Sequence, residues 1–229
     1  MNVAIIPARG GSKRIPRKNI KIFNGKPIIY WSIKAAEESG VFDSIIVSTD
    51  DDEIASVAKE LGADIPFIRN KKISDDFTGT AEVIKDAIFQ INKAGFTPNN
   101  VCCIYPTAPL INSKDISKTL KILISNSNID YIYPVTEYAH PIHRSMIINQ
   151  EGKMDFLFPE NQLARTQDLP ITFHDAGQFY WGTSDSWMEN KKMHSGTGFK
   201  IPNWRVVDID NEDDWERAEL LFQSINSKK

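Results

Sequence analysis

The sequence has few cysteines and no long apolar segment. Its 229 residues include only Cys102 and Cys103, which are adjacent in VCCIYP. Neighbouring residues of a strand point to opposite faces, so we expect two small buried strand residues and no disulfide between them. No stretch is long and apolar enough to span a membrane, and MNVAIIPARGG lacks the charged-then-apolar order of a secretory signal. We therefore expect a cytoplasmic protein without a membrane partner.

Acidic residues are absent from the first part of the chain. None occurs before Glu37, whereas eight lysines or arginines do. The formal net charge is nevertheless −3, and nonspecific binding to a phosphate backbone needs a broad positive surface. We therefore expect no nucleic-acid partner, and the local excess of positive charge indicates a local anion-binding site.

Short apolar runs alternate with amphipathic stretches along most of the chain. Predicted strands lie at 3–7, 44–49, 101–106 and 205–210, and predicted helices at 27–40, 51–62, 80–95, 115–125 and 211–226. This order predicts an α/β fold with a Rossmann-like, mostly parallel sheet flanked by helices. The ligand should then lie at the carboxyl ends of the strands. Asp50, Ser113 and Asn211 are the expected N-caps of the second, fourth and last helices.

From Thr136 to Ala176 the alternation breaks into aromatic, proline-containing sequence of weak periodicity. We expect a single domain spanning 1–229, in which approximately 136–176 form an inserted arm or a short antiparallel excursion. An apolar excursion of this kind often packs against a second copy of the same chain. A homodimer is therefore expected.

The segment PARGGSKRIPRKN, residues 7–19, follows the first predicted strand and crowds five cations into one turn. Its paired glycines let the amides of Gly10, Gly11 and Ser12 approach a bound anion without obstruction by side chains. The spacing matches neither G-x-x-x-x-G-K-[ST] nor G-x-G-x-x-G, the usual nucleotide fingerprints. These residues alone predict a polyphosphate site, with a solvated basic turn as the alternative.

Two aspartates near the end of the chain are the candidate metal ligands. Asp208 and Asp210 flank Ile209 in the predicted strand 205–210, and a period of two places both carboxylates on one face. Such a pair suits Mg²⁺, which uses one or two carboxylates together with substrate phosphates. Capping or solvated charge is the alternative for these residues.

Several blocks of the sequence resemble a known family. PARGGSKRIPRKNIKIFNGKPIIYWSI is similar to the signature loop and first helix of the cytidylyltransferases that activate sialic and other nonulosonic acids, the acylneuraminate cytidylyltransferase family. STDDDEIASVAKELGA, IPFIR, YPTAPL and VVDIDNEDDWERAE follow in the order of the family's later blocks, so the resemblance covers nearly the whole chain. It implies a nucleotidyltransferase type A-like fold and an Mg²⁺-dependent reaction. In that reaction CMP passes from CTP to the anomeric hydroxyl of a nonulosonic acid, and pyrophosphate is released.

Three further blocks bear on the acceptor sugar. VCCIYPTAPL, RTQDLP and HDAGQFYWG are most similar to the family members that act on pseudaminic acid, whereas sialic acid relatives usually carry Q-P-T-S-P at 105–109. The resemblance thus implies pseudaminic acid, with N-acylneuraminate, legionaminic acid or deoxyoctulosonic acid as alternatives. A catalytically silent nucleotide-sugar sensor and a phosphotransferase with the same cationic loop are the other classes left open. Flagellin, capsule and lipopolysaccharide are all possible recipients of the product.

The resemblance also suggests roles for individual residues. Arg9, Lys18 and Asp210 are the expected catalytic residues, and electrostatics and positioning should supply most of the catalysis. The expected CTP-binding residues are Arg9, Gly10, Gly11, Ser12, Lys18, Asn19, Arg69 and Thr80. The expected sugar-binding residues are Thr107, Arg165, His174, Gln178 and Tyr180, and the expected Mg²⁺ ligands are Asp208 and Asp210. Arg165 would fork to the sugar's carboxylate, with a salt bridge within the arm as its alternative, and Thr80 is also a possible helix cap.

Overall fold

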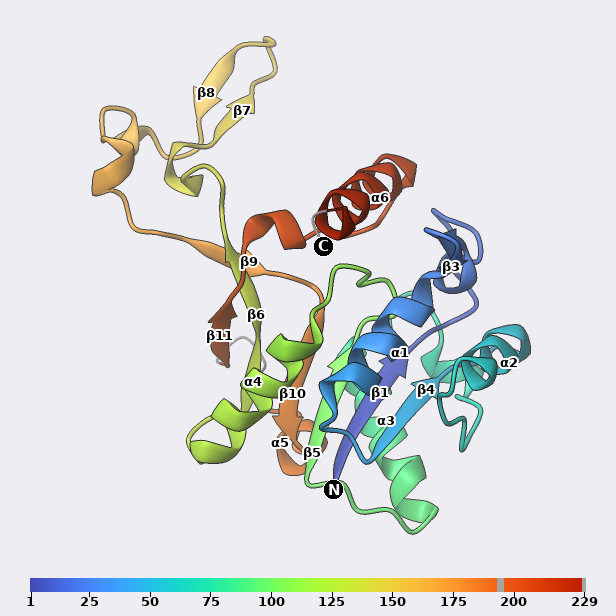
Figure 1. Ribbon diagram of the computed structural model, residues 1–229. Coiled ribbons are helices and arrows are strands. Elements are labelled where there is room, and N and C mark those ends of the chain that lie inside the picture. Colours follow the sequence, from blue (N-terminus) through green and yellow to red (C-terminus); the bar gives the residue numbers. More distant parts are fainter. Residues whose placement is uncertain (193–195, 228–229) are drawn as a thin grey trace.

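The structure is a computed structural model that describes residues 1–192 and 196–227. Its main sheet has seven strands: β1 (Asn2–Pro7), β4 (Ser44–Ser48), β5 (Asn100–Ile104), β6 (Tyr131–Glu137), β9 (Phe173–Asp175), β10 (Phe179–Thr183) and β11 (Thr197–Lys200). Six of them follow the order β11-β6-β10-β5-β1-β4, and β9 pairs with β6 beside this path. Figure 1 shows the sheet with helices on both faces.

Strand direction confirms the predicted α/β fold with its mostly parallel sheet and adds two reversed strands, β10 and β9, of which β9 is antiparallel to β6. β1 is parallel to both β4 and β5, and β11 is parallel to β6, whereas β10 runs antiparallel to β5 and β6. From β1 the chain passes to β4 on one side and later returns to β5 on the other. The carboxyl end of β1 is therefore a switch point of the kind at which open α/β sheets bind ligands.

The α-helices are α1 (Ile28–Ser39), α2 (Asp52–Glu60), α3 (Thr80–Lys93), α4 (Ser113–Ser125), α5 (Ser184–Met188) and α6 (Glu212–Asn226). The short 3-10 helices are η1 (Lys18–Ile20), η2 (Lys71–Ile73), η3 (Ile142–Arg144), η4 (Pro159–Asn161), η5 (Thr166–Asp168) and η7 (Asn203–Arg205). All five predicted helices are confirmed, with ends that shift by one or two residues. The short α5 has no counterpart among the predicted helices.

The predicted N-caps are right for one helix and wrong for two. Asn211 caps α6 in a capping box with Asp214, as expected. The cap of α2 is Asp51, whose side chain accepts from the Ile54 amide, because Asp50 is turned toward the loop after β1. The cap of α4 is Asn112, one residue before the predicted Ser113. α3 begins after Gly79, so Thr80 is the first helical residue and does not cap the helix.

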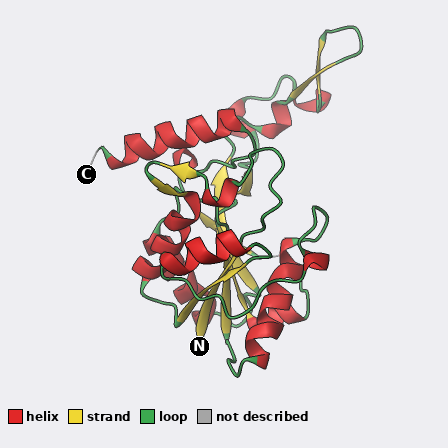
Figure 2. Cartoon of the chain, turned by 90° about the vertical axis from the view of Figure 1, so that its right-hand side faces the viewer, coloured by secondary structure: helices red, strands yellow, loops and turns green. Residues whose placement is uncertain are grey.

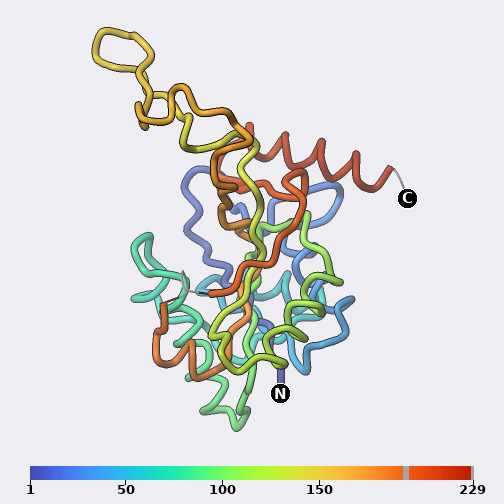
Figure 3. Tube along the Cα trace, turned by 90° about the vertical axis from the view of Figure 1, so that its left-hand side faces the viewer, coloured from blue at the N-terminus to red at the C-terminus, as the bar shows by residue number. Residues whose placement is uncertain are grey.

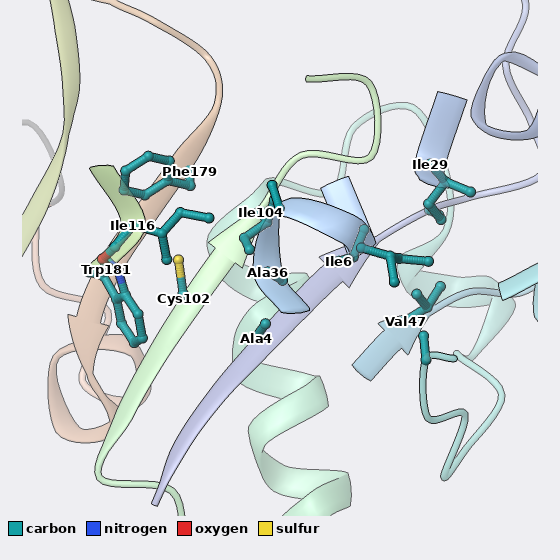
Figure 4. Close-up of a cluster of buried hydrophobic side chains, with 14 of the residues drawn as sticks. Ala4, Ile6, Ile29, Ala36, Val47, Cys102, Ile104, Ile116, Phe179 and Trp181 are labelled. Carbon is teal, nitrogen blue, oxygen red and sulfur yellow. Dashed lines mark hydrogen bonds between the residues drawn. The ribbon is translucent and has the colours of Figure 1, made fainter. Parts of the chain in front are cut away.

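Two hydrophobic clusters fill the space between the sheet and its helices. One packs β1, β4, β5 and β10 against α1, α2 and α4, and the other packs the opposite face against α3 and α5. Cys102 belongs to the first cluster and Cys103 to the second, which confirms that these free thiols point to opposite faces. Burial raises the pKa of both thiols. Figure 4 shows the first cluster, in which Trp181 donates to the Ile116 carbonyl at 3.1 Å and joins β10 to α4.

A third cluster lies under α6, beside the small hairpin of β2 (Ile22–Phe23) and β3 (Lys26–Pro27). It consists of Ile15, Phe23, Ile28, Ile209, Trp215 and Ala218. Ile15 comes from the basic loop and Ile209 from the segment of the aspartate pair. Figures 1 and 3 show α6 across the carboxyl end of the sheet, opposite the N-terminus. The cluster therefore packs the two predicted phosphate-site segments against one another.

The segment between β6 and β9 projects from the body of the molecule. It contains the hairpin of β7 (Met146–Ile148) and β8 (Met154–Phe156), which extends away from the sheet in Figures 1 and 2. Many apolar side chains of this arm are exposed, including those of Ile148 and Leu163. Within the described ranges, no helix has the length and apolar character needed to cross a membrane.

Candidate active site

The loop that follows β1 is attached to the end of β4 by its own backbone. Ala8 donates to the Ser48 carbonyl at 2.9 Å, and the Gly10 amide donates to Asp50 Oδ1 at 3.1 Å. A Cβ on Gly10 would lie 2.6 Å from Asp51 Oδ2, so only glycine allows this approach. Ser12 donates to the Gly10 carbonyl at 3.1 Å. Two of the three amides expected to hold an anion are thus engaged within the chain.

The first cations of the loop contact an acidic turn before α3. Arg9 donates to the Asp75 carbonyl at 2.6 Å and pairs with Asp76 at 2.7 Å, and Lys13 also pairs with Asp76. Hydrogen bonds from Lys13 and then Arg9 lower the pKa of Asp76. The turn therefore places a carboxylate among cations that were predicted to hold phosphate.

Arg17 is the cation that fixes the loop to α2. Its backbone is left-handed, with a φ of 55°, and its guanidinium forks to Asp51 with hydrogen bonds of 2.6 and 2.8 Å. This pairing lowers the pKa of Asp51 to about 2. The Asp51 carboxylate thus accepts from Arg17 and from the first turn of α2, and it packs against Gly10, so it fixes the entry to the basic loop.

The segment of the aspartate pair is irregular, so the strand predicted for 205–210 is wrong. η7 ends at Arg205, and residues 206–210 belong to no helix or strand. The predicted alternation is nevertheless present, because Ile209 is buried between the more accessible Asp208 and Asp210. Both carboxylates therefore lie on the side away from the core, as the spacing indicates.

The basic loop and the aspartate segment meet directly. Lys18 Nζ donates to the Ile209 carbonyl at 2.6 Å and lies 4.0 Å from Asp210 Oδ1, and Arg14 Nη2 lies 2.7 Å from the same oxygen. Burial lowers the pKa of Lys18, while burial and then the Asp210 carboxylate raise the pKa of Asp208. An added anion would stabilise the charged lysine, and an added cation would stabilise the charged aspartate. The charges of the site therefore favour binding of an anion beside Lys18 and of a cation beside Asp208.

A cavity of about 500 Å³ opens between these two segments. Six of the residues selected from the sequence line it: Arg9, Ser12, Lys18, Asn19, Thr107 and Asp208. Asn19 is buried and donates to the Arg9 carbonyl at 2.9 Å, which holds the start of the loop. A cavity walled by cations on one side and by a carboxylate on another fits a phosphorylated ligand with its metal counterion.

A smaller cavity of about 240 Å³ lies beside Arg9 and is lined by Arg69, Thr80 and Tyr105. Arg69 is buried, and burial lowers the pKa of its guanidinium. Its Nη2 lies 3.6 Å from Asp50 Oδ1 and has no hydrogen-bond partner among the described residues. A buried donor without a partner is costly, so this nitrogen is available to a ligand acceptor. Thr80 Oγ1 lies 3.3 Å from the Tyr105 hydroxyl.

A larger cavity, of about 970 Å³, lies between the base of the arm and α6. Of the predicted sugar residues, His174 and Tyr180 line it, and Tyr180 donates to Asp175 Oδ2 at 2.7 Å. Tyr105 and Asp208 line both this cavity and the 500 Å³ cavity, so the two adjoin. Sequence reasoning did not select Tyr105, Asp175, Trp204 or Arg217 as lining residues. A position in a recognised block was the available signal for Tyr105, Asp175 and Arg217, whereas Trp204 belongs to none of these blocks.

Two predicted sugar residues lie elsewhere. Gln178 is 3% exposed, lines none of these three cavities and donates from Nε2 to the Arg205 carbonyl at 2.6 Å. Arg165 lies on the arm with its side chain 71% exposed, and pairs with Asp168 at 2.7 Å. The salt bridge that the sequence offered as the alternative for Arg165 is therefore present, and this chain does not bring Arg165 to its own cavity.

The donor set at the aspartate pair fits a hard divalent cation. Among the residues that the structure describes, no cluster of three or more His, Cys, Asp or Glu side chains forms a metal cage. Asp208 and Asp210 provide two oxygen donors beside the phosphate-sized cavity. Mg²⁺ commonly binds through one or two carboxylates together with substrate phosphates, so the pair suffices for this ion.

Comparison with known proteins shows the family of the chain. A sequence model of the family "Cytidylyltransferase" matches residues 3–194, and the chain belongs to this family of nucleotidyltransferases. Within it, the chain is 41% identical to the pseudaminic acid cytidylyltransferase of Campylobacter jejuni over 97% of its own length and 96% of the relative's. It is 28% identical to the CMP-N,N'-diacetyllegionaminic acid synthase of Legionella pneumophila over 96% of each chain.

A solved structure supports the fold. The CMP:2-keto-3-deoxy-manno-octonic acid synthetase complexed with CTP superposes with a TM-score of 0.74, covering 98% of this chain and 99% of the other. The two sequences are 15% identical, so the likeness concerns the fold.

Proposed function

We propose that this enzyme transfers CMP from CTP to the anomeric hydroxyl of pseudaminic acid and releases pyrophosphate. The observation that carries the proposal is the meeting of the basic loop and the aspartate pair at one cavity, which adjoins a larger cavity through Tyr105 and Asp208. The choice of sugar is supported by 41% identity to a pseudaminic acid enzyme, against 28% to a legionaminic acid enzyme.

Each of the three cavities binds a different part of the two substrates. Arg9 and Lys18 hold phosphate oxygens of CTP in the 500 Å³ cavity, and Arg69 and Thr80 receive the nucleoside in the 240 Å³ cavity. The sugar occupies the 970 Å³ cavity beside His174. Its anomeric oxygen attacks the α-phosphorus in line, the bond between the α-phosphorus and pyrophosphate breaks, and the proton of the hydroxyl passes to solvent. Positioning and neutralisation of charge on the phosphoryl oxygens are the contributions of the chain.

Mg²⁺ is part of the proposal, with Asp208 and Asp210 as the residues that hold it. When bound, the ion supplies positive charge that offsets the charge of the phosphates. The Asp210 carboxylate also pairs with Arg14 and lies 4.0 Å from Lys18, so it connects the metal site to the cations of the loop.

A homodimer assembled through the arm completes the proposal. Exposed apolar side chains of the arm, such as Ile148 and Leu163, would be covered by a second copy. Arg165 stays a candidate for the sugar carboxylate in such an assembly, because it projects with the arm away from its own cavity. The use of CTP places the reaction in the cytoplasm, where nucleoside triphosphates are made.

Pyrophosphate release across a panel of substrates tests this function. CTP, ATP, GTP and UTP are each combined with Mg²⁺ and with pseudaminic, N-acetylneuraminic, N,N'-diacetyllegionaminic or deoxyoctulosonic acid. We expect release with CTP and pseudaminic acid at a kcat/KM well above every other pair. A preference for another acid would reassign the sugar, CTP binding without release would indicate a sensor, and formation of a nucleoside diphosphate would indicate a phosphotransferase.

A further inference from the structure

The segment that presents the aspartate pair needs contacts from outside to hold it. Residues 206–210 have no helical or sheet hydrogen bonds of their own. At the far end, the amides of Asp210 and Asn211 donate to Asp214 Oδ2 at 3.0 and 3.1 Å. In the middle, Ile209 is buried under α6. The near end follows Arg205, so the contacts of Arg205 fix the position in space from which the segment begins.

The side chain of Arg205 is held by a buried ion pair. Its Nη2 lies 2.5 Å from Asp115 Oδ2, and the two side chains are only 12% and 11% exposed. Asp115 lies in the first turn of α4, which is itself packed against the sheet. A buried charge that loses its partner is strongly unfavourable, so this pair ties Arg205 firmly to α4.

The main chain of Arg205 is held separately by Gln178. The side-chain amide of Gln178 donates to the Arg205 carbonyl at 2.6 Å, and the Gln178 carbonyl accepts from the Tyr105 amide at 2.9 Å. Tyr105 lies where the two larger cavities meet. Gln178 thus connects the start of the aspartate segment to the wall shared by the nucleotide and sugar cavities.

From these contacts we infer that Arg205 is a positioning residue for Asp208 and Asp210, held in place by Asp115 and Gln178. The inference rests on the proposed function, and it gives Gln178 a role other than contact with the sugar. Asp208 and Asp210 lie three and five residues beyond Arg205 with no regular structure between them. A shift of the anchor therefore moves the carboxylates relative to the basic loop, and a displacement of about 1 Å can cost on the order of a hundredfold in rate.

The test compares Arg205→Met, Arg205→Lys and Gln178→Met with the wild type. Lys191→Met is the matched control, because it breaks an ion pair with Asp130 of 2.7 Å near α5, at the opposite end of the sheet. Each protein is assayed for pyrophosphate release per folded molecule, below its melting temperature. Its affinity for Mn²⁺ is measured by electron paramagnetic resonance with and without CTP.

We expect Arg205→Met and Gln178→Met to lower kcat at least tenfold and to weaken Mn²⁺ binding. The KM values for CTP and for the sugar should stay within twofold of the wild type. Arg205→Lys should recover part of the loss because it keeps a cation for Asp115, and the control should behave as the wild type does.

Three outcomes would overturn the inference: an unchanged kcat, unchanged Mn²⁺ affinity, or a raised sugar KM at constant kcat in Gln178→Met. The last would return Gln178 to the sugar site. If Arg205→Met does not fold, Gln178→Met decides the question. If the wild type itself releases no pyrophosphate, the proposed function fails, while the Mn²⁺ affinities still test the placement of the carboxylates.

Discussion

Gly10 is a residue at which the basic loop packs closely against Asp51, the N-cap of α2. Its missing side chain leaves room for the Asp51 carboxylate, which also binds Arg17. We predict that Gly10→Ala displaces either Asp51 or the loop, because the new Cβ would lie 2.6 Å from Asp51 Oδ2. The expected result is a rise in KM for CTP of about tenfold or more, the equivalent of about 1.4 kcal/mol in binding, measured by steady-state kinetics.

Gly11→Ala is the matched control for that substitution. A Cβ at Gly11 would meet no atom of the described chain within 4 Å. Its KM for CTP should therefore change by less than about threefold, as is usual for a surface substitution away from strained or buried features. Equal effects of the two substitutions would show that the contact between Gly10 and Asp51 does not set the shape of the loop.

Lys18 provides a prediction for pH dependence. Burial lowers its pKa below the ordinary value of 10.5, so the cation is present below the lowered pKa and is lost as the pH rises through it. Because kcat/KM reports on the free enzyme, kcat/KM for CTP should fall on the alkaline side, at a pH below 10.5. In Lys18→Arg the charge persists, so the activity that remains should not show this fall. The same alkaline fall in both proteins would assign it to another group.

Segment 205–210 has the residue alternation of a strand but is not a strand. Alternation of Asp208, Ile209 and Asp210 correctly indicates which side chains share a side. A strand also needs a neighbouring strand, and here the backbone finds other partners: Lys18 binds the Ile209 carbonyl, and Asp214 binds the amide of Asp210. The residue pattern is local, whereas Lys18 comes from a part of the chain 191 positions away.

The reversed strand β10 escaped prediction for a related reason. FYWGT is a short apolar run, and such a run does not reveal the direction of a strand. The main-sheet strands and the α-helices up to α4 were predictable, because the apolar runs there alternate with amphipathic stretches long enough for crossover helices, whereas the small hairpin of β2 and β3 was not predicted. The exact cap of α2 was not, since Asp50 and Asp51 are chemically equal and only the position of Gly10 separates them.

The arm gives a prediction about assembly. Ile148 of β7 is 71% exposed, and Ile148→Asp should prevent the proposed contact with a second copy. Sedimentation velocity should show a dimer for the wild type and a monomer for this variant. Ile124→Asp is the control, because Ile124 is 63% exposed on α4, outside the arm. A monomeric wild type, or a variant that remains dimeric, would contradict assembly through this hairpin.

At the scale of the whole molecule, the site depends on segments that are distant in the sequence. Lys18 and Ile209 are separated by 191 positions and lie within hydrogen-bond distance. The cations of the basic loop and the paired aspartates could be recognised as phosphate and metal ligands from the sequence, because each group is continuous or nearly so along the chain. The residues that surround Gln178 and Arg165 could not be predicted from the sequence. The first depends on which loop packs beside β10, and the second on the direction in which the arm projects.

A crystal structure of the protein with CTP and Mg²⁺, without an acceptor sugar, would show whether the basic loop and the aspartate pair bind one triphosphate. We predict that the triphosphate lies between Arg9 and Lys18 on one side and Asp208 and Asp210 on the other, with the cytosine beside Arg69. A nucleotide bound away from this cavity, or a triphosphate in contact with only one of the two segments, would contradict the account.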